Sequence, residues 1–313
     1  MTAIRILFMG SPAFAVPSLR ALVEAGHDVA AVVTQPDRPA GRGGRLTPPD
    51  VKVAAQELGI PVLQPETLRD SGVQEELAAI EPEVTVVAAY GKILPRAVLA
   101  IPRRGNVNVH ASLLPRWRGA SPIAAAILAG DEQTGVSIME MAPEMDAGPV
   151  IAQVAIPIPP DATTGSLERE LAELGAKTLV DVLPRWFTGE LKATPQDESL
   201  VTYCGLIQKG DGHLRADMSA AEAERAVRAY DPWPGAFVEY RGSRLGIWKA
   251  HVEPQPEPLP VGATLVVGRL PAIAFRDGVL VLDEVQRVGA KRIGGSQFLN
   301  GERGQLAESV GLR

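Results

Sequence analysis

The sequence has very little of several residue types that mark particular classes of protein. Among its 313 residues it has one cysteine, Cys204, and four histidines. A single cysteine excludes an internal disulfide, and without Cys/His clusters a structural zinc site has no ligands. We therefore expect a protein of a reducing compartment that binds no metal.

Long apolar runs are also missing. No stretch approaches the roughly 18 apolar residues of a membrane-spanning helix, and Gly10 and Pro12 interrupt the apolar opening segment too early for a signal peptide. The turn after the first predicted strand lacks the G-x-G-x-x-G pattern of dinucleotide-binding proteins. No sustained apolar surface pattern requires a partner subunit. We expect a cytoplasmic monomer that does not associate with membranes.

The remaining composition is that of an ordinary globular protein. Hydrophobic residues make up 46% and charged residues 22% of the chain, and the length favours two domains. A net charge of −6 counts against a nucleic-acid partner. Between Glu83 and Asp131, however, the chain has no acidic residue and six basic ones, so this segment can lie against negative charge.

Strands and helices alternate along the first two-thirds of the chain. The expected strands are residues 4–9, 29–34, 61–63, 84–89 and 106–110, with a helix between each pair. Two paired strands, 135–141 and 150–158, and an amphipathic helix over 164–187 follow. This order predicts an α/β domain over residues 1–188, with a Rossmann-like, mostly parallel sheet and helices on both faces.

The pattern changes in the last third of the chain. Residues 189–207 are turn-rich and are expected to form a linker. From residue 208 onward, short β-runs separated by glycine and proline surround one helix at 220–230. This spacing predicts a smaller C-terminal β-barrel of the OB-like kind over residues 208–313.

Asn108 and His110 lie at the end of the strand predicted at 106–110. Residues two apart on a strand share a face, so both side chains point the same way at the edge where parallel sheets bind ligands. An amide can stabilise an oxyanion and an imidazole can move a proton, as acyl transfer requires. No serine or cysteine nucleophile stands beside them, and such a pair is more often only a polar cap.

Asp146 lies further along, in the loop expected between two strands. A carboxylate there could orient or charge the imidazole of His110. An aspartate before a short glycine-containing turn is, however, usually a turn residue. Residue types alone therefore leave open whether these three side chains act together.

Three motifs resemble one family of enzymes. NVHASLLPRWRGASPI, with MDAG downstream and TQPDRPAGRG upstream, is similar to the methionyl-tRNA formyltransferase family, and the resemblance extends over essentially the whole chain. Matched position by position, it implies a catalytic asparagine, histidine and aspartate at Asn108, His110 and Asp146. It also implies a folate-contacting turn at Ser112, Leu113, Leu114 and Pro115.

The resemblance implies a reaction as well as residues. The formyl group of 10-formyltetrahydrofolate would be transferred to the α-amino group of methionine on initiator tRNA, for translation initiation. The nucleophile then belongs to the substrate, which explains why the sequence offers none. Our hypothesis is that Asn108 and protonated His110 stabilise the tetrahedral oxyanion, while Asp146 keeps the imidazole charged and assists deprotonation of the amine.

A basic segment, TQPDRPAGRGGRLTPPD (residues 34–50), is the other informative motif. Its prolines and glycines predict a mobile surface loop without helix or strand. Arg38, Arg42 and Arg45 suit phosphate contacts, and the resemblance implies that this loop wedges into the tRNA acceptor end, with Arg42 mattering most. The family often has two lysines where Gly44 and Arg45 stand here, so one phosphate contact is in doubt.

A second basic patch is expected in the C-terminal domain. The residues are Arg241, Arg244, Lys249, Arg287, Lys291 and Arg292. Such a patch would hold the body of the tRNA, and its affinity would fall as salt rises.

Three alternatives remain at this level. A related folate-dependent enzyme could formylate a sugar amine or a ribonucleotide, but the arginine-rich loop and the β-rich tail are explained better by tRNA. A non-catalytic RNA-binding module is disfavoured because all three matched catalytic positions are intact. Dehydrogenase chemistry is the weakest alternative, for want of a glycine fingerprint.

Overall fold

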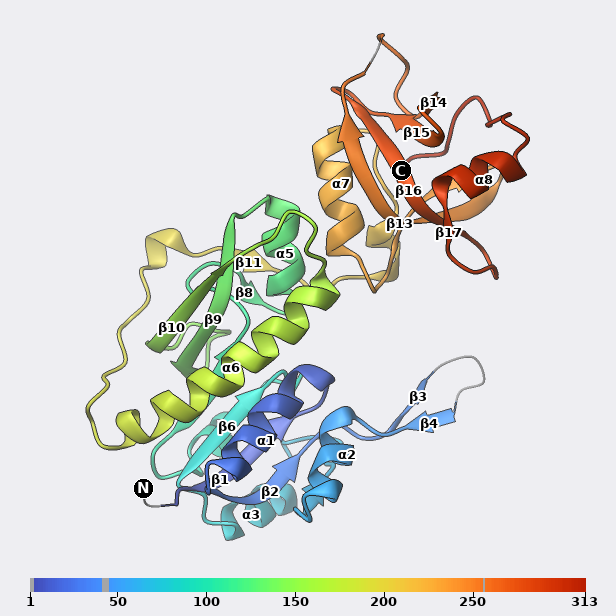
Figure 1. The fold of residues 1–313 in the computed structure, drawn as a ribbon. Helices are drawn as coiled ribbons and strands as arrows, with labels where there is room; N and C mark the ends of the chain where they lie inside the picture. The colour runs from blue at the N-terminus through green and yellow to red at the C-terminus, as the bar shows by residue number, and fades with distance from the viewer. Residues whose placement is uncertain (1–2, 41–44, 256) are drawn as a thin grey trace. The chain divides into compact units, whose positions relative to one another are not determined.

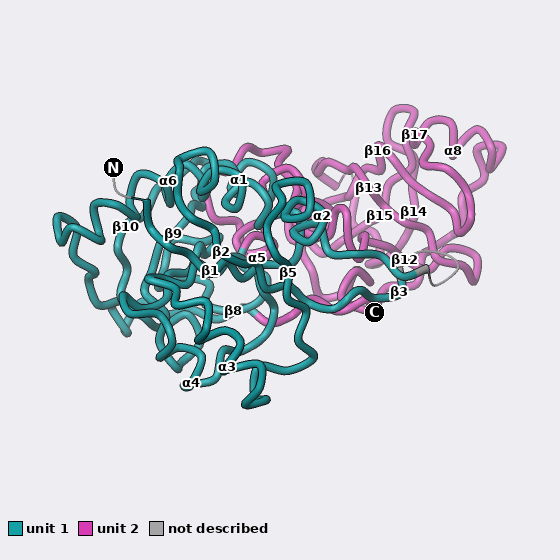
Figure 2. The backbone as a smooth tube through the Cα atoms, turned by 90° about the horizontal axis from the view of Figure 1, so that it is seen from below, with its two compact units in different colours: residues 1–122, 133–157, 168–204 teal, residues 123–132, 158–167, 205–313 magenta. Residues whose placement is uncertain are grey.

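The computed structural model describes residues 3–40, 45–255 and 257–313, shown in Figure 1. The chain forms two compact units, coloured separately in Figure 2. Unit 1 holds residues 1–122, 133–157 and 168–204, and unit 2 holds residues 123–132, 158–167 and 205–313. No helix in the described part of the chain is both long and apolar enough to cross a membrane.

Unit 1 is built on a seven-stranded sheet of order β10-β9-β7-β6-β1-β2-β5. Its parallel strands are β1 (Arg5–Gly10), β2 (Asp28–Val33), β5 (Val62–Leu63), β6 (Val84–Ala88) and β7 (Asn106–His110). Antiparallel β9 (Gln133–Glu140) and β10 (Val150–Pro157) extend the sheet beyond β7. The predicted mostly parallel sheet is confirmed.

Helices cover both faces of this sheet. They are α1 (Val16–Glu24), α2 (Asp50–Glu57), α3 (Ser71–Ala79), α4 (Arg96–Leu99) and α6 (Thr164–Phe187), with a 3-10 turn, η1, at Ala13–Ala15. Leu77 of α3 and Val98 of α4 pack with Val87 on one face. On the other, a Cβ at Gly175 of α6 would lie 2.8 Å from Val109, so glycine lets the helix approach the sheet closely.

Residues 34–50 contain a β-hairpin, which corrects the expectation that this segment excludes strands. β3 (Arg38–Ala40) and β4 (Arg45–Thr47) are antiparallel, and Figure 1 shows them extending away from the sheet. A two-stranded hairpin needs pairing along only one side of each strand, so it tolerates a proline such as Pro39. The intervening residues 41–44 lie outside the described part of the chain.

The segment expected as a linker, residues 189–207, is divided between the two units. Up to residue 204 it belongs to unit 1, where Thr194 pairs with Val150. It contains the short 3-10 helix η2 (Glu198–Leu200) and β11 (Tyr203–Cys204), which pairs with β8 (Arg118–Gly119). This pairing brings residues 194–204 against the turn that follows β7.

Unit 2 contains a six-stranded antiparallel sheet. The strands are β12 (Ala236–Tyr240), β13 (Ser243–Glu253), β14 (Thr264–Val267), β15 (Leu270–Ala274), β16 (Val279–Arg287) and β17 (Ile293–Gly294). The C-terminal tail bridges both edges, because Gly311 pairs with Glu239 of β12 and Ser309 pairs with Ala263 beside β14. The predicted C-terminal β domain is confirmed, and the tail gives it a barrel-like closure.

The described helical segments of unit 2 are α5 (Pro122–Ala129), which belongs to it from Ile123 onward, α7 (Ala220–Ala229), α8 (Gly295–Gly301) and the 3-10 turn η3 (Lys209–Gly212). α7 begins with a capping box in which Ser219 and Glu222 satisfy each other's backbone amides. Ala223 and Val227 of α7 pack into a core with residues of the sheet. The sequence predicted α7 but not α8, β15 or β17.

Candidate active site

β7 presents Asn108 and His110 on one face, as the alternation of a strand requires. By register, Asn108 lies between Val87 of β6 and Met139 of β9, and His110 pairs with Ser137. Both side chains are buried, at 9% and 6% exposure. Among the described residues, nothing hydrogen-bonds to the Asn108 amide, so its N–H groups are free to bind a substrate oxygen.

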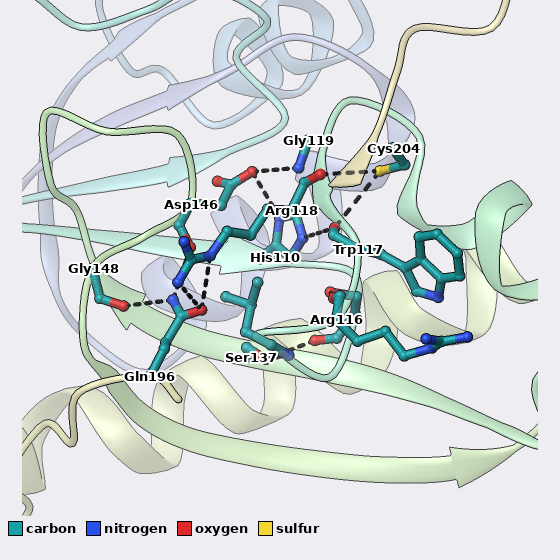
Figure 3. A network of polar contacts seen from close by, with 12 residues as sticks. His110, Arg116, Trp117, Arg118, Gly119, Ser137, Asp146, Gly148, Gln196 and Cys204 are labelled. Carbon is teal, nitrogen blue, oxygen red and sulfur yellow. Dashed lines mark hydrogen bonds and ion pairs between the residues drawn. The ribbon is translucent and has the colours of Figure 1, made fainter. Parts of the chain in front are cut away.

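His110 has a neighbour at each ring nitrogen. Nε2 lies 3.0 Å from the carbonyl oxygen of Trp117, and Nδ1 lies 3.8 Å from Oδ2 of Asp146, as Figure 3 shows. A carbonyl can only accept, so Nε2 is the donor in that bond. Nδ1 is thus the ring nitrogen that faces the Asp146 carboxylate.

Asp146 is fixed by the loop between β9 and β10. Its Oδ2 accepts a hydrogen bond of 2.9 Å from the backbone amide of Gly119. Its φ of +50° is in the left-handed region, where an aspartate is tolerated when neighbouring contacts hold it. The structure therefore brings Asn108, His110 and Asp146 together, although the roles implied for them stay a prediction.

The turn at residues 112–115 is tied to β9 and β10. Ser137 donates to the Ser112 carbonyl at 2.6 Å and accepts from Leu114 N at 3.1 Å, while Gln153 donates to the Leu114 carbonyl at 2.8 Å. Ser112 and Leu114 are buried, whereas Leu113 and Pro115 are partly exposed. The latter two are thus the side chains of this turn that could meet a ligand.

Arg118 and Gln196 border the site, and sequence reasoning missed both. Arg118 is only 2% exposed; its guanidinium contacts Gln196 Oε1 at 2.9 and 3.0 Å and Glu198 Oε1 at 2.7 Å. Burial acts to lower the pKa of Arg118, but the bond to Glu198 helps outweigh it and the pKa is raised. Gln196 lies in the segment that the sequence predicted to be a linker, so composition did not indicate that it would contact the site.

The arginines of the basic segment are placed only in part. Arg38 is exposed on β3, Arg45 lies on β4, and Arg42 lies outside the described residues. The base of the hairpin is anchored, since Lys52 Nζ lies 2.8 Å from both oxygens of Asp37. This hydrogen bond holds the pKa of Asp37 below its ordinary value.

The basic residues expected to form a patch on unit 2 differ in their partners. Arg241 and Arg287 pair with Glu302, and Arg292 lies over Trp248 at 3.6 Å. Lys249 and Lys291 are exposed and form no ion pair with any described residue. These two lysines are therefore the members most available to an external phosphate.

Other features of unit 1 do not extend the site. A cavity of about 340 Å³ lies at the start of β7, where Asn106, Arg104 and Trp186 line it; His110 stands at the far end of that strand. Within the described ranges, no group of three or more His, Cys, Asp or Glu residues is arranged to hold a metal ion.

Comparison with known proteins assigns this site to a class. Residues 4–183 match the formyl transferase family and residues 206–303 match the formyl transferase C-terminal domain. The methionyl-tRNA formyltransferase of Chloroflexus aurantiacus is 52% identical over 95% of this chain and 96% of its own. The chain therefore belongs to the methionyl-tRNA formyltransferase family.

Solved structures share the fold at low sequence identity. The sugar 3N-formyl transferase WlaRD, crystallised with dTDP and 5-N-formyl-THF, has a TM-score of 0.69 at 17% identity, covering 93% of this chain and 100% of that one. HypX from Aquifex aeolicus, in complex with tetrahydrofolic acid, has a TM-score of 0.64 at 20% identity over 98% of this chain. The chain spans about half (49%) of HypX.

Proposed function

We propose that this protein transfers a formyl group from 10-formyltetrahydrofolate to the α-amino group of methionyl initiator tRNA. The observation that carries the proposal is that Asn108, His110 and Asp146 lie together. The side-chain amide of Asn108 is buried and has no protein partner among the described residues. No nucleophilic side chain is needed, because the substrate amine is the nucleophile. The family membership and the folate bound to the structural relatives support it.

The donor supplies an activated formyl group whose carbonyl oxygen gains negative charge when the amine attacks. The amide of Asn108 donates a hydrogen bond to that oxygen, and the imidazolium of His110 stabilises the same charge. Asp146 faces His110 Nδ1 and accepts the proton that the amine loses as its bond to the formyl carbon forms. The intermediate then collapses: the carbonyl forms again, the bond from the formyl carbon to the donor nitrogen breaks, and that nitrogen takes up the proton held by Asp146 as tetrahydrofolate leaves. Leu113 and Pro115 of the neighbouring turn are the side chains that contact the folate.

The remaining assignments follow the sequence-derived domains. Residues 1–188 are the catalytic domain and residues 208–313 bind the tRNA body, joined by residues 189–207. Arg38, Arg42 and Arg45 contact the acceptor end. The enzyme acts as a monomer in the cytoplasm. A sugar amine substrate is disfavoured, because the 52% identity to a methionyl-tRNA formyltransferase extends over both domains.

The test is a formyl-transfer assay with 10-formyltetrahydrofolate and three acceptors: methionyl initiator tRNA, methionyl elongator tRNA and free methionine. We expect selective formylation of the initiator. Arg42→Ala should lower kcat/KM for tRNA without changing KM for the folate. Equal activity on free methionine, or no activity on tRNA while the folate still binds, would contradict the proposal.

A further inference from the structure

We infer that Gln196 is a positioning residue that holds Asp146 in register with His110 by clamping two loops together. The inference rests on the proposed function, because it assigns Gln196 a task in that reaction. Gln196 touches neither a substrate nor the histidine; it acts through the backbone of the loop that carries Asp146. Figure 3 shows it between that loop and Arg118.

The His110–Asp146 pair depends on two backbone segments that leave the sheet at different strands. The turn after β7 supplies the Trp117 carbonyl that binds His110 and the Gly119 amide that binds Asp146. The loop after β9 supplies Asp146 itself. Trp117 and Asp146 both have positive φ angles, +62° and +50°, so both segments are held in conformations that neighbouring contacts must maintain.

Gln196 bonds to both segments through one amide group. Its Nε2 donates to the carbonyl oxygens of Asp146 and Gly148, each at 2.7 Å. Its Oε1 accepts from Nε and Nη2 of Arg118, at 3.0 and 2.9 Å. Both atoms of the amide are therefore engaged, and its orientation is determined because carbonyls only accept and a guanidinium only donates.

The partners of Gln196 are themselves fixed. Arg118 is 2% exposed, and its backbone pairs with Tyr203 of β11. Gly148 is packed so tightly that a Cβ there would lie 1.8 Å from the Glu140 carbonyl, so this end of the loop cannot shift independently. A displacement of the Gln196 amide would therefore move mainly Asp146, because the loop is less tightly packed there than at Gly148.

Replacing Gln196 by glutamate separates the two halves of the clamp. Gln196→Glu has the same shape and keeps an acceptor for Arg118, but it turns a carboxylate oxygen toward the carbonyls of Asp146 and Gly148. Repulsion between this oxygen and the two carbonyls releases the loop that carries Asp146. We expect kcat to fall about 100-fold, as for a misplacement of about 1 Å, while KM for 10-formyltetrahydrofolate stays within about twofold because the folate turn is untouched.

A double-mutant cycle distinguishes positioning from a purely structural role. If Gln196 acts through Asp146, adding Gln196→Glu to Asp146→Asn should produce no further loss of kcat. Independent losses that multiply in the double variant would overturn the inference. So would near wild-type kcat in Gln196→Glu. A wild-type enzyme that formylates no tRNA would instead contradict the proposed function.

Two further variants control for folding. Gln74→Glu removes a comparable bond, from Nε2 to the Leu68 carbonyl at 2.8 Å, at a site on α3, and should leave kcat unchanged. Gln196→Met removes the clamp without adding charge. If Gln196→Glu fails to fold, thermal unfolding will reveal it, and Gln196→Met then decides: a selective fall in kcat supports the clamp, and an unchanged kcat refutes it.

Discussion

Asn108 and His110 share a strand face but are held in different ways. His110 is bonded to Trp117 and faces Asp146, whereas the Asn108 side chain has no partner among the described residues. Asn106, two residues earlier on the same face, donates to the Leu99 carbonyl at 2.7 Å. The strand therefore carries one asparagine that is bonded within the protein and one whose side chain is available to a ligand.

This difference predicts opposite outcomes for the same substitution. Asn108→Ala should lower kcat by about 100-fold to 1,000-fold, the usual effect of losing an oxyanion donor, with little change in stability. Asn106→Ala should cost about 1 kcal/mol of stability and leave kcat nearly unchanged. Steady-state kinetics and urea unfolding measure both, and equal kcat values for the two variants would refute the assignment.

His27 should make the stability of the protein depend on pH. It is 7% exposed, its Nδ1 accepts from the Ile4 amide at 3.3 Å, and burial lowers its pKa below 6.5. The folded state thus disfavours the proton that the unfolded state takes up. Stability is present above pH 6.5 and is lost as pH falls through the lowered folded pKa.

We therefore expect urea unfolding of the wild type to show a steeper loss of stability between about pH 6.5 and 5 than that of His27→Gln. Glutamine can still accept from Ile4 and does not titrate. His251 acts in the opposite direction, because hydrogen bonding to Asp283 raises its pKa. Its contribution is the same in the wild type and in His27→Gln, so the difference between the two profiles reports His27 alone. Identical pH profiles would exclude His27 as a source.

At the scale of elements, the β3–β4 hairpin is attached through its base rather than through its tip. Asp37, immediately before β3, binds Lys52 of α2 and also accepts from Gln64 at 2.8 Å. These contacts determine the direction in which the hairpin leaves the sheet. Arg38 and Arg45 therefore depend on Lys52 for their placement.

Lys52→Met should weaken tRNA recognition without affecting the folate. Without Lys52 the base of the hairpin loses its ion pair to Asp37, so we expect kcat/KM for tRNA to fall by roughly fivefold, the modest effect of a surface ion pair. KM for 10-formyltetrahydrofolate should not change. Lys177→Met, at an exposed position on α6, is the control, and an equal effect in both variants would argue against anchoring.

Considered as a whole, the molecule has a net charge of −6, which repels tRNA, so binding of tRNA depends on local basic surfaces. KM for tRNA should therefore rise steeply with salt. The double variant Lys249→Ala/Lys291→Ala should reduce the slope of log KM against log salt by up to about two, roughly one for each phosphate that a lysine no longer neutralises. Arg287 is a poor choice for this test, because it pairs with Glu302.

Measurement of initial rates between low and physiological salt checks this prediction. Lys177→Ala serves as the control and should leave the slope unchanged. A KM that does not vary with salt would contradict electrostatic binding of the tRNA, and an unchanged slope in the double variant would assign the phosphate binding to other residues.

The regular elements of this protein could be predicted from its sequence alone. Periods of two and 3.6 predicted strands such as β7 and helices such as α6 to within a few residues, because burial of one face acts on each element locally. The same periodicity placed Asn108 and His110 on one face. The family motifs then predicted a role for Asp146, which spacing alone could not distinguish from a turn residue, and that role stays a prediction.

The contacts between the loops could not be predicted from sequence in this way and are seen only in the folded chain. The Trp117 carbonyl on His110, the Gly119 amide on Asp146 and the Gln196 clamp join residues up to 78 positions apart. The β3–β4 hairpin lies in a proline- and glycine-rich segment, and the C-terminal tail that closes the barrel forms only isolated bridges, so neither has a periodic pattern that sequence reasoning could detect. Such contacts depend on non-repeating backbone paths, and a one-dimensional pattern of polarity does not encode where two such paths cross.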